Sequence, residues 1–256
     1  MTMPEIISLG SNCQSKFSIK PLQPRQPAYP FDWIITGDVQ DIINVINTRD
    51  LSLFTDFASF KISFSHFNHN LDAEHKRLLF AIDQCELKKL ILDVNENSTI
   101  DLDRMYDEFR ELVAKAHKIT ASNLDLETTA KYLFEITGTV LQKEQISLLH
   151  DHQIRIPWAE VREKYERRFE RLFEALDSGK TLLFVRLAAD KDDDDKLYDC
   201  LQKHTQSFYL LVIRAGTRGF VNLCKGYYQY WGKVDPIPPF FQDVLEEFLR
   251  LFVTKE

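Results

Sequence analysis

The sequence predicts an α/β fold in which a mostly parallel sheet is flanked by helices and the middle of the chain carries a helical insertion. Residues 181–187 and 207–213 are short apolar runs, which is typical of strands buried on both faces. A helical pattern over 192–204 separates them, so we expect a parallel pair with a right-handed crossover. Residues 5–9 form a similar run, which ends at Gly10.

A long amphipathic helix from Pro157 to Leu176 is the second observation behind this fold class. Arg168 falls on the edge of its apolar stripe, so we predict that Arg168 is largely buried and paired with a carboxylate, most favourably Asp32. The apolar stripe itself has the 3.6-residue period of a helix and consists of Val161, Tyr165, Phe169, Leu172 and Leu176.

The remaining elements follow from caps, prolines and apolar spacing. Ser11 and Asn12 are good N-cap residues, so a helix is expected to run from Cys13 in its first turn to about Ile19. Prolines exclude a helix from there to Pro30. Further along we expect an apolar segment over 31–35, a helix ending at Ile46, strands near 61–65, 87–94, 146–149 and 226–231, and helices over 101–118, 126–137 and 240–252. These elements predict one domain spanning residues 1–256, with a helical insertion over about 70–145.

Composition and charge exclude several classes of protein. The chain has 256 residues, 44% of them hydrophobic, and a net charge of −7, so we expect a globular protein without a nucleic-acid partner. Glycine occurs only 8 times and no phosphate-binding glycine motif is present, so no cofactor is implied. No apolar run is long enough to span a membrane and no secretory signal is evident. We therefore expect a cytoplasmic location, with signal-less export into a host left open.

Metal binding is not expected at either of the two clusters of ligand-type residues. His66, His69 and His75, with Asp72, are irregularly spaced and are better explained as exposed loop histidines. The acidic run over 190–195 is better explained as a solvated loop and helix start, where carboxylates are favoured by the helix dipole. The four cysteines form no CxxC pair, so a zinc knuckle is not supported either.

The segment around Cys13 is the sharpest candidate for chemistry. A strand, a glycine turn and a helix start would place the thiol at the positive end of a helix dipole, which lowers its pKa and favours the nucleophilic thiolate. The alternative is that Cys13 is a small buried hydrophobic residue. His150 is the candidate base, and Asp151 or Asp32 is the candidate carboxylate that orients its imidazole.

Five short motifs occur in order along the chain: SLGSNC at 8–13, PFDW at 30–33, HD at 150–151, KYERR at 164–168 and FVR at 184–186. Together they resemble an uncharacterised bacterial family of papain-like cysteine peptidases. The resemblance implies that Cys13 is the nucleophile and His150 its base, and we expect a protein or peptide as the substrate. It also raises an alternative fold, the papain-like α+β arrangement of a helical lobe beside an antiparallel β lobe. In this family an aromatic residue follows the His-Asp pair, whereas this chain has His152.

We therefore expect cysteine-dependent acyl chemistry, as in a peptidase, amidase, deamidase or acyltransferase, with two alternatives left open. Around the site, Ser11, Asn12, Trp33, Arg168 and Arg186 are expected to bind substrate or to support the structure. In the first alternative, Ser11 is the nucleophile of a serine esterase, although no D-x-x-H motif follows near the end of the chain. In the second, the chain is a non-catalytic module that binds a phosphate or sugar through Arg168 and Arg186.

Overall fold

The structure is a computed structural model that describes most of the chain, in two compact units. One unit comprises Met1–Leu51 together with Tyr165–Glu256, and the other comprises Ser52–Lys164. The residues described are 3–10, 13–51, 61–64, 71–83, 85–90, 102–136, 139–143, 146–148, 156, 158–188, 193–217, 219–232 and 241–253.

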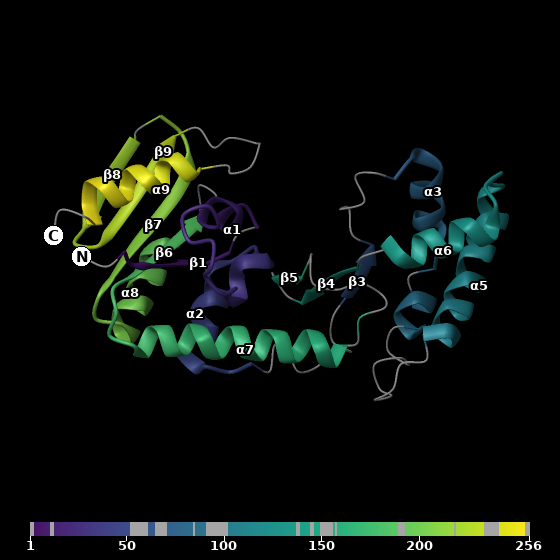
Figure 1. Cartoon of the computed structure of the whole chain (residues 1–256), viewed down its shortest axis with the longest axis horizontal. Helices are drawn as coiled ribbons and strands as arrows, with labels where there is room; N and C mark the ends of the chain where they lie inside the picture. Colours follow the sequence, from purple (N-terminus) through teal and green to yellow (C-terminus); the bar gives the residue numbers. More distant parts are fainter. Residues whose placement is uncertain are drawn as a thin grey trace. The chain divides into compact units, whose positions relative to one another are not determined.

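The first unit is built on a sheet with the strand order β1-β6-β7-β9-β8 (Figure 1). Its strands are β1 (Glu5–Ser8), β6 (Leu182–Leu187), β7 (Phe208–Ala215), β8 (Gly219–Cys224) and β9 (Tyr227–Gly232). β1, β6, β7 and β9 pair in parallel, and β8 pairs with β9 antiparallel. The predicted α/β class with a mostly parallel sheet is confirmed. The alternative of a helical lobe beside an antiparallel β lobe is not the arrangement of this unit.

Helices cover both faces of this sheet. α1 (Gln14–Ile19) and α9 (Gln242–Phe248), continued by a π-helical turn over Leu249–Val253, cover one face. α8 (Asp194–His204) packs against the other face and against α2 (Val39–Thr48). Because side chains alternate along a strand, Leu183 and Val185 face α1 and α9, whereas their neighbours on β6 face the opposite way. The crossover from β6 through α8 to β7 is the predicted strand–helix–strand unit.

α7 (Trp158–Asp177) confirms the long helix predicted from the apolar period. Every residue of the predicted stripe is buried, and Arg168 on its edge is only 7% exposed. Arg167 is exposed, as the helical rotation requires, whereas Arg171 is half-buried and donates from Nη1 to the carbonyl of Ala28 at 3.1 Å. The burial of Arg168 is therefore confirmed.

The segment after α1 bends back toward β1 through a proline-led turn. A 3-10 helix occupies Pro30–Trp33, and the short strand β2 (Ile34–Thr36) follows it. Proline suits the first helical position because its fixed φ is already helical and its missing N–H would have no partner there. Asp32 accepts the backbone N–H of Tyr29 at 2.8 Å and closes the turn.

The second unit combines helices with a small antiparallel sheet. Its elements are β3 (Lys61–Phe64), α3 (Ala73–Ala81), α5 (Leu102–Thr120), α6 (Leu126–Ile136), β4 (Thr139–Lys143) and β5 (Ile146–Leu148). β4 pairs antiparallel with both β3 and β5. α5 packs against α3 and α6, burying Phe109 and Val113 on one side of the helix. Among the described residues, no helix is long and apolar enough to cross a membrane.

Three local predictions differ from the structure. Residues 87–94 were predicted as a strand, but residues 85–90 are helical and 91–94 lie outside the described residues. The cause is Asp83, whose Oδ1 accepts the backbone N–H groups of Cys85 at 2.7 Å and Glu86 at 2.9 Å and so caps a helix. β4 and β8 were not predicted. The six residues of β8 are half-buried or exposed, so they lack the apolar run of a buried strand.

Candidate functional site

A tight turn at Gly10 leads from the carboxyl end of β1 toward Cys13. Leu9 extends the pairing by donating its N–H to the carbonyl of Val185 at 2.9 Å. Gly10 then adopts a φ of +77°, and the Oγ of Ser8 accepts its N–H at 3.3 Å. A Cβ at position 10 would lie 2.8 Å from Oγ1 of Thr36. Both the backbone conformation and the close neighbour therefore require glycine.

Cys13 lies directly beyond this turn, at the N-cap position of α1, and is half-buried. We expected the helix start to lower the pKa of its thiol. Burial instead raises that pKa, and a smaller lowering comes from its own backbone N–H. The physical reason is that Cys13 is half-buried, and the loss of hydration disfavours the charged thiolate.

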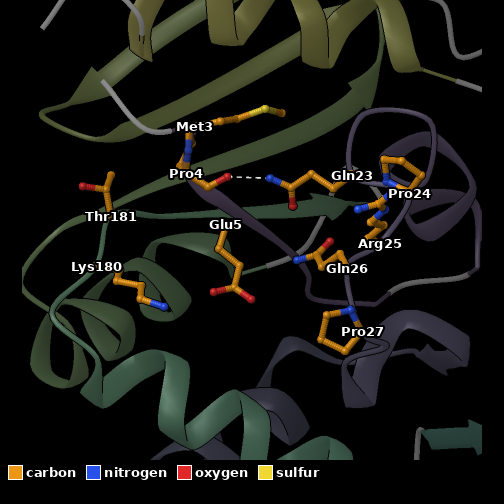
Figure 2. A pocket seen from close by; sticks show the side chains of 10 residues that line it. All are labelled: Met3, Pro4, Glu5, Gln23, Pro24, Arg25, Gln26, Pro27, Lys180 and Thr181. Carbon is orange, nitrogen blue, oxygen red and sulfur yellow. Dashed lines mark hydrogen bonds between the residues drawn. The ribbon is translucent and has the colours of Figure 1, made fainter.

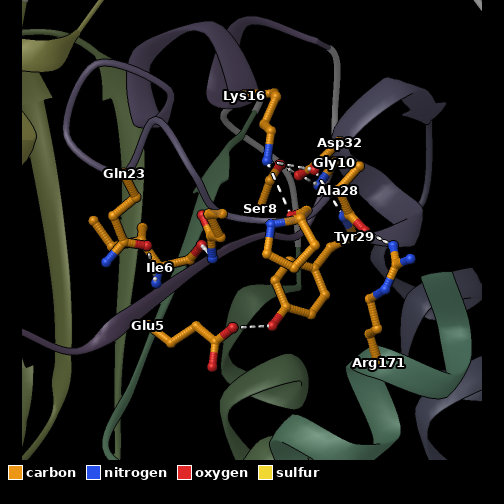
Figure 3. A network of polar contacts seen from close by, with 12 residues as sticks. Glu5, Ile6, Ser8, Gly10, Lys16, Gln23, Ala28, Tyr29, Asp32 and Arg171 are labelled. Atoms are coloured by element: carbon orange, nitrogen blue, oxygen red, sulfur yellow. Dashed lines mark hydrogen bonds and ion pairs between the residues drawn. The ribbon is translucent and has the colours of Figure 1, made fainter.

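Asp32 is buried beside α1, where its partner is Lys16 (Figure 3). Its Oδ2 lies 2.9 Å from Nζ of Lys16, and the two side chains are only 1% and 8% exposed. We predicted Arg168 as the partner. Burial raises the pKa of Asp32, while the charge and hydrogen bond of Lys16 and, more weakly, the charge of Arg168 oppose this rise. The guanidinium of Arg168 stacks on the ring of Tyr165 at 5.0 Å.

Sequence reasoning missed Lys16 because a lysine in a short amphipathic helix is ordinarily solvated. In this structure its ammonium also donates to the carbonyl of Pro27 at 3.4 Å, so it ties α1 to the segment that carries Asp32. Trp33 supports the same junction, since its ring meets that of Phe17 edge-to-face at 5.5 Å. The contact with Phe17 is the one through which Trp33 can support this junction.

A second buried ionic cluster lies at the carboxyl ends of β6 and β7. Asp194, at the start of α8, is 2% exposed and forms ion pairs with Arg186 of β6 and Arg214 of β7. The expectation that the acidic run is solvated is wrong at Asp194, whereas Asp193 and Asp195 are exposed. A buried carboxylate at this position is explained by the two guanidiniums, which the sequence places on different strands.

Arg186 connects this cluster to the Gly10 turn. Its Nη1 donates to the carbonyl of Leu9 at 3.0 Å and to Oγ1 of Thr36 at 3.1 Å, and its Nε lies 3.5 Å from Oδ1 of Asp194. The side chain is 1% exposed. Because its hydrogen bonds are made inside the protein, Arg186 is badly placed to anchor a phosphate or sugar from solvent.

Cys200 has asparagine and histidine neighbours, a constellation that sequence reasoning missed. Oδ1 of Asn47 lies 3.4 Å from Sγ of Cys200 and 3.0 Å from Nε2 of His204. Cys200 is 2% exposed, and burial raises its pKa to about 11. A buried thiol that stays protonated at neutral pH is a poor nucleophile, so this group is a structural hydrogen-bond network.

Several candidate residues lie outside the described part of the chain. These are Ser11, Asn12, His150, Asp151, His66 and His69. His75 is described and lies on α3 rather than in a loop, with its Nδ1 2.8 Å from Oδ2 of Asp72, the N-cap residue of that helix. Over the described residues, no group of three or more metal-ligand side chains occurs.

A pocket of about 670 Å³ lies beside the amino end of β1 (Figure 2). It is lined by residues at or before the amino ends of β1 and β6, including Glu5 and Lys180, and by the loop around Gln23 and Gln26. Cys13, in contrast, follows the carboxyl end of β1, which is where sites form in open parallel sheets. The pocket is therefore not the site of the Cys13 thiol.

The fold and the thiol define an α/β protein with a half-buried cysteine at the carboxyl end of its parallel sheet. The chain belongs to the family described as "Putative papain-like cysteine peptidase (DUF1796)", which matches residues 4–209. The resemblance predicted from the motifs is thus confirmed. No curated protein and no solved structure matches the chain.

Proposed function

We propose that the protein is a cysteine-dependent acyl-transfer enzyme acting on a protein or peptide, with Cys13 as its nucleophile. The observation that carries the proposal is the position of Cys13, directly after a glycine turn at the carboxyl end of β1, in a family described as cysteine peptidases. Peptidase, amidase, deamidase and acyltransferase activities share the first chemical step and remain within the proposal.

The proposed chemistry begins with transfer of the Cys13 thiol proton to the imidazole of His150. The thiolate attacks the substrate carbonyl carbon, and the tetrahedral intermediate collapses to a thioester as the imidazolium protonates the leaving amine. Water or another nucleophile, deprotonated by the same imidazole, then releases the acyl group and restores the thiol. No cofactor takes part in these steps.

The environment of Cys13 makes a base necessary. Burial raises the pKa of the Cys13 thiol, so the resting thiol is protonated at neutral pH unless a neighbouring imidazole accepts the proton. Asp32 is already engaged through Oδ2 with Lys16 and with the N–H of Tyr29. This engagement favours Asp151 as the carboxylate that orients His150, and gives Asp32 a structural role.

The test is the pH profile of Cys13 alkylation by iodoacetamide, followed site by site with mass spectrometry. Cys85 and Cys224 are exposed, so both are first replaced by serine to keep them from consuming the reagent. We expect Cys13 to react at neutral pH with an apparent pKa below the ordinary thiol value of about 8.5. His150→Ala should raise that apparent pKa, whereas the matched variant His152→Ala should leave it unchanged.

An apparent pKa above the ordinary thiol value in the parent protein, or an identical profile in His150→Ala, would contradict the proposed base. Activity against a peptide-ester or peptide-amide library provides the second readout. Cys13→Ser should abolish turnover while leaving the thermal unfolding midpoint close to that of the parent. Full turnover by Cys13→Ser would overturn the nucleophile assignment itself.

A further inference from the structure

We infer that Arg186 is a positioning residue for Cys13, acting through the carbonyl of Leu9 and the turn at Gly10. The inference rests on the proposed function, because it treats the Cys13 thiol as the group being positioned. It assigns to Arg186 neither contact with substrate nor transfer of a proton.

The guanidinium of Arg186 acts on the backbone of Leu9. Leu9 is the last residue before the turn, and its N–H already donates to the carbonyl of Val185 on β6. Arg186, the next residue of β6, donates from Nη1 to the carbonyl of Leu9 at 3.0 Å. Both backbone groups of Leu9 are therefore held by β6. The peptide plane that enters the Gly10 turn thus has a fixed orientation.

Three segments of the chain converge on one nitrogen, Nη1 of Arg186. Nη1 of Arg186 also donates to Oγ1 of Thr36 at 3.1 Å. That same oxygen would lie 2.8 Å from a Cβ at position 10, so Thr36 lies directly against the turn. The end of β1, the end of β2 and the side chain from β6 meet at this point. Movement of Arg186 would release the two neighbours of the turn together.

Arg186 is itself held by the buried carboxylate of Asp194. Its Nε lies 3.5 Å from Oδ1 of Asp194, and Oδ2 of the same carboxylate forms an ion pair with Arg214. Arg214 in turn lies over the ring of Trp231 at 5.5 Å. Buried charges in such a cluster have little freedom to move, since each loses its compensation if it does. A planar guanidinium can face Asp194 and Leu9 at once, whereas a lysine ammonium presents a single point of charge.

The experiment compares the pH profile of Cys13 alkylation in the parent with that in Arg186→Lys, in the background lacking Cys85 and Cys224. We expect alkylation at pH 7 to become about tenfold slower, corresponding to a rise of about one unit in the apparent pKa. At pH 10, where the thiol ionises without a base, the two rates should agree within about twofold. A general loss of structure would instead raise the rate at pH 10, where the thiol is ionised in either case and only its exposure changes.

The matched control is Arg171→Lys. Arg171 makes the same kind of bond, from Nη1 to the carbonyl of Ala28 at 3.1 Å, but that carbonyl is not in the Cys13 turn. The pH profile of Cys13 alkylation in Arg171→Lys should equal that of the parent. Thr36→Val serves if Arg186→Lys fails to fold, because it removes an acceptor of the same nitrogen at nearly constant volume. It should slow alkylation at pH 7 in the same direction.

Hydrogen–deuterium exchange of a peptide covering residues 6–13 separates failure of this inference from failure of the proposed function. Faster exchange there in Arg186→Lys, and not in Arg171→Lys, together with the shifted profile, supports the positioning role. A parent-like profile in Arg186→Lys and Thr36→Val overturns it, even when His150→Ala behaves as proposed. An alkylation profile that is insensitive to His150→Ala overturns the proposed base, and full turnover by Cys13→Ser overturns the proposed function, while the exchange contrast still reports on the turn.

Discussion

The two ends of the parallel sheet are held by different chemistry. At the carboxyl end, Arg186, Asp194 and Arg214 are buried charges that compensate one another beside the Gly10 turn. At the amino end, the neutral side-chain amides of Gln23 and Gln26 form hydrogen bonds with the backbone of the edge strand. Buried charges keep a fixed geometry at the cost of desolvation, whereas amide caps satisfy backbone groups with little dependence on their surroundings. The candidate nucleophile therefore follows the end of the sheet at which buried charges compensate one another.

The amide caps at the amino end lie along the free edge of β1 (Figure 2). Gln23 accepts the N–H of Ile6 at 3.1 Å and donates to the carbonyl of Pro4 at 2.7 Å. Gln26 donates to the carbonyl of Ile6 at 2.6 Å. Two side-chain amides thus take the positions that a neighbouring strand would take. This arrangement protects an edge strand from pairing with another chain.

The largest effect is expected from Asp194→Asn, which removes the negative charge that faces two buried guanidiniums. We expect the free energy of unfolding to fall by about 3–5 kcal/mol, measured by urea denaturation. Asp199→Asn changes an exposed carboxylate on the same helix and should stay within about 0.5 kcal/mol of the parent. Equal losses of unfolding free energy in the two variants would show that burial of the cluster does not determine its contribution to stability.

The two ends also differ in what surrounds a glycine of positive φ. Gly10→Ala adds backbone strain of about 1–2 kcal/mol and, because of the contact with Thr36, an overpacking cost of about 1–3 kcal/mol. Gly179, before β6, has a φ of +66° and nothing within 4 Å of a Cβ, so Gly179→Ala should show the strain alone. A Gly10→Ala protein as stable as the Gly179→Ala protein would contradict a tight turn.

A smaller effect is expected when the amide caps are removed. Gln23→Ala combined with Gln26→Ala should cost roughly 1–3 kcal/mol in unfolding free energy, because about three hydrogen bonds are lost. The exposed edge should also increase self-association, measured by sedimentation velocity over a range of protein concentrations. Gln202→Ala, at an exposed position on α8, is the control. A strictly monomeric double variant would argue that other features protect this edge.

The smallest predicted effect concerns the pH dependence of stability, to which two aspartates should contribute with opposite signs. Burial raises the pKa of Asp32, so its contribution to stability is present below its ordinary pKa of about 4 and is lost as pH rises through the raised value. The hydrogen bond to Arg49 lowers the pKa of exposed Asp177, so its contribution is present above about pH 4 and is lost as pH falls through the lowered value.

Urea denaturation between pH 3 and pH 7 tests this difference. Relative to Asp32→Asn, the parent should lose unfolding free energy as pH rises, and relative to Asp177→Asn it should gain. Parallel trends for the two variants would mean that the Lys16 ion pair, rather than burial, dominates at Asp32.

The family description suggests a papain-like architecture, whereas the observed sheet of the first unit is mostly parallel. Papain-like cysteine peptidases were the basis for the alternative of an antiparallel β lobe, yet the first four strands of this sheet are parallel. The match to the family covers residues 4–209, and within that range β1, β6 and β7 pair in parallel. One α/β domain with a helical insertion over about 70–145 remains our prediction for its domain organisation.

The sequence by itself determined the features that depend on local periodicity. The buried runs of β6 and β7, the crossover helix α8 and the stripe of α7 follow from spacing alone, because each element repeats its own pattern. The turn at Gly10 was also predictable, since few residues other than glycine accept a positive φ. Edge strands such as β8 escaped prediction because half-exposed strands lack an apolar run.

Only the tertiary structure decided how the buried charges pair and what the thiol experiences. Asp32 was predicted to pair with Arg168, but it pairs with Lys16, because the pairing depends on how α1 packs against the 3-10 turn. Asp194 was assigned to solvent because its sequence neighbours are charged, yet β6 and β7 enclose it with two guanidiniums. The raised pKa of Cys13 likewise reflects burial, which no local pattern encodes. Charge pairing and desolvation depend on distances between segments far apart in the chain, so they become definite only when the sheet and helices are assembled.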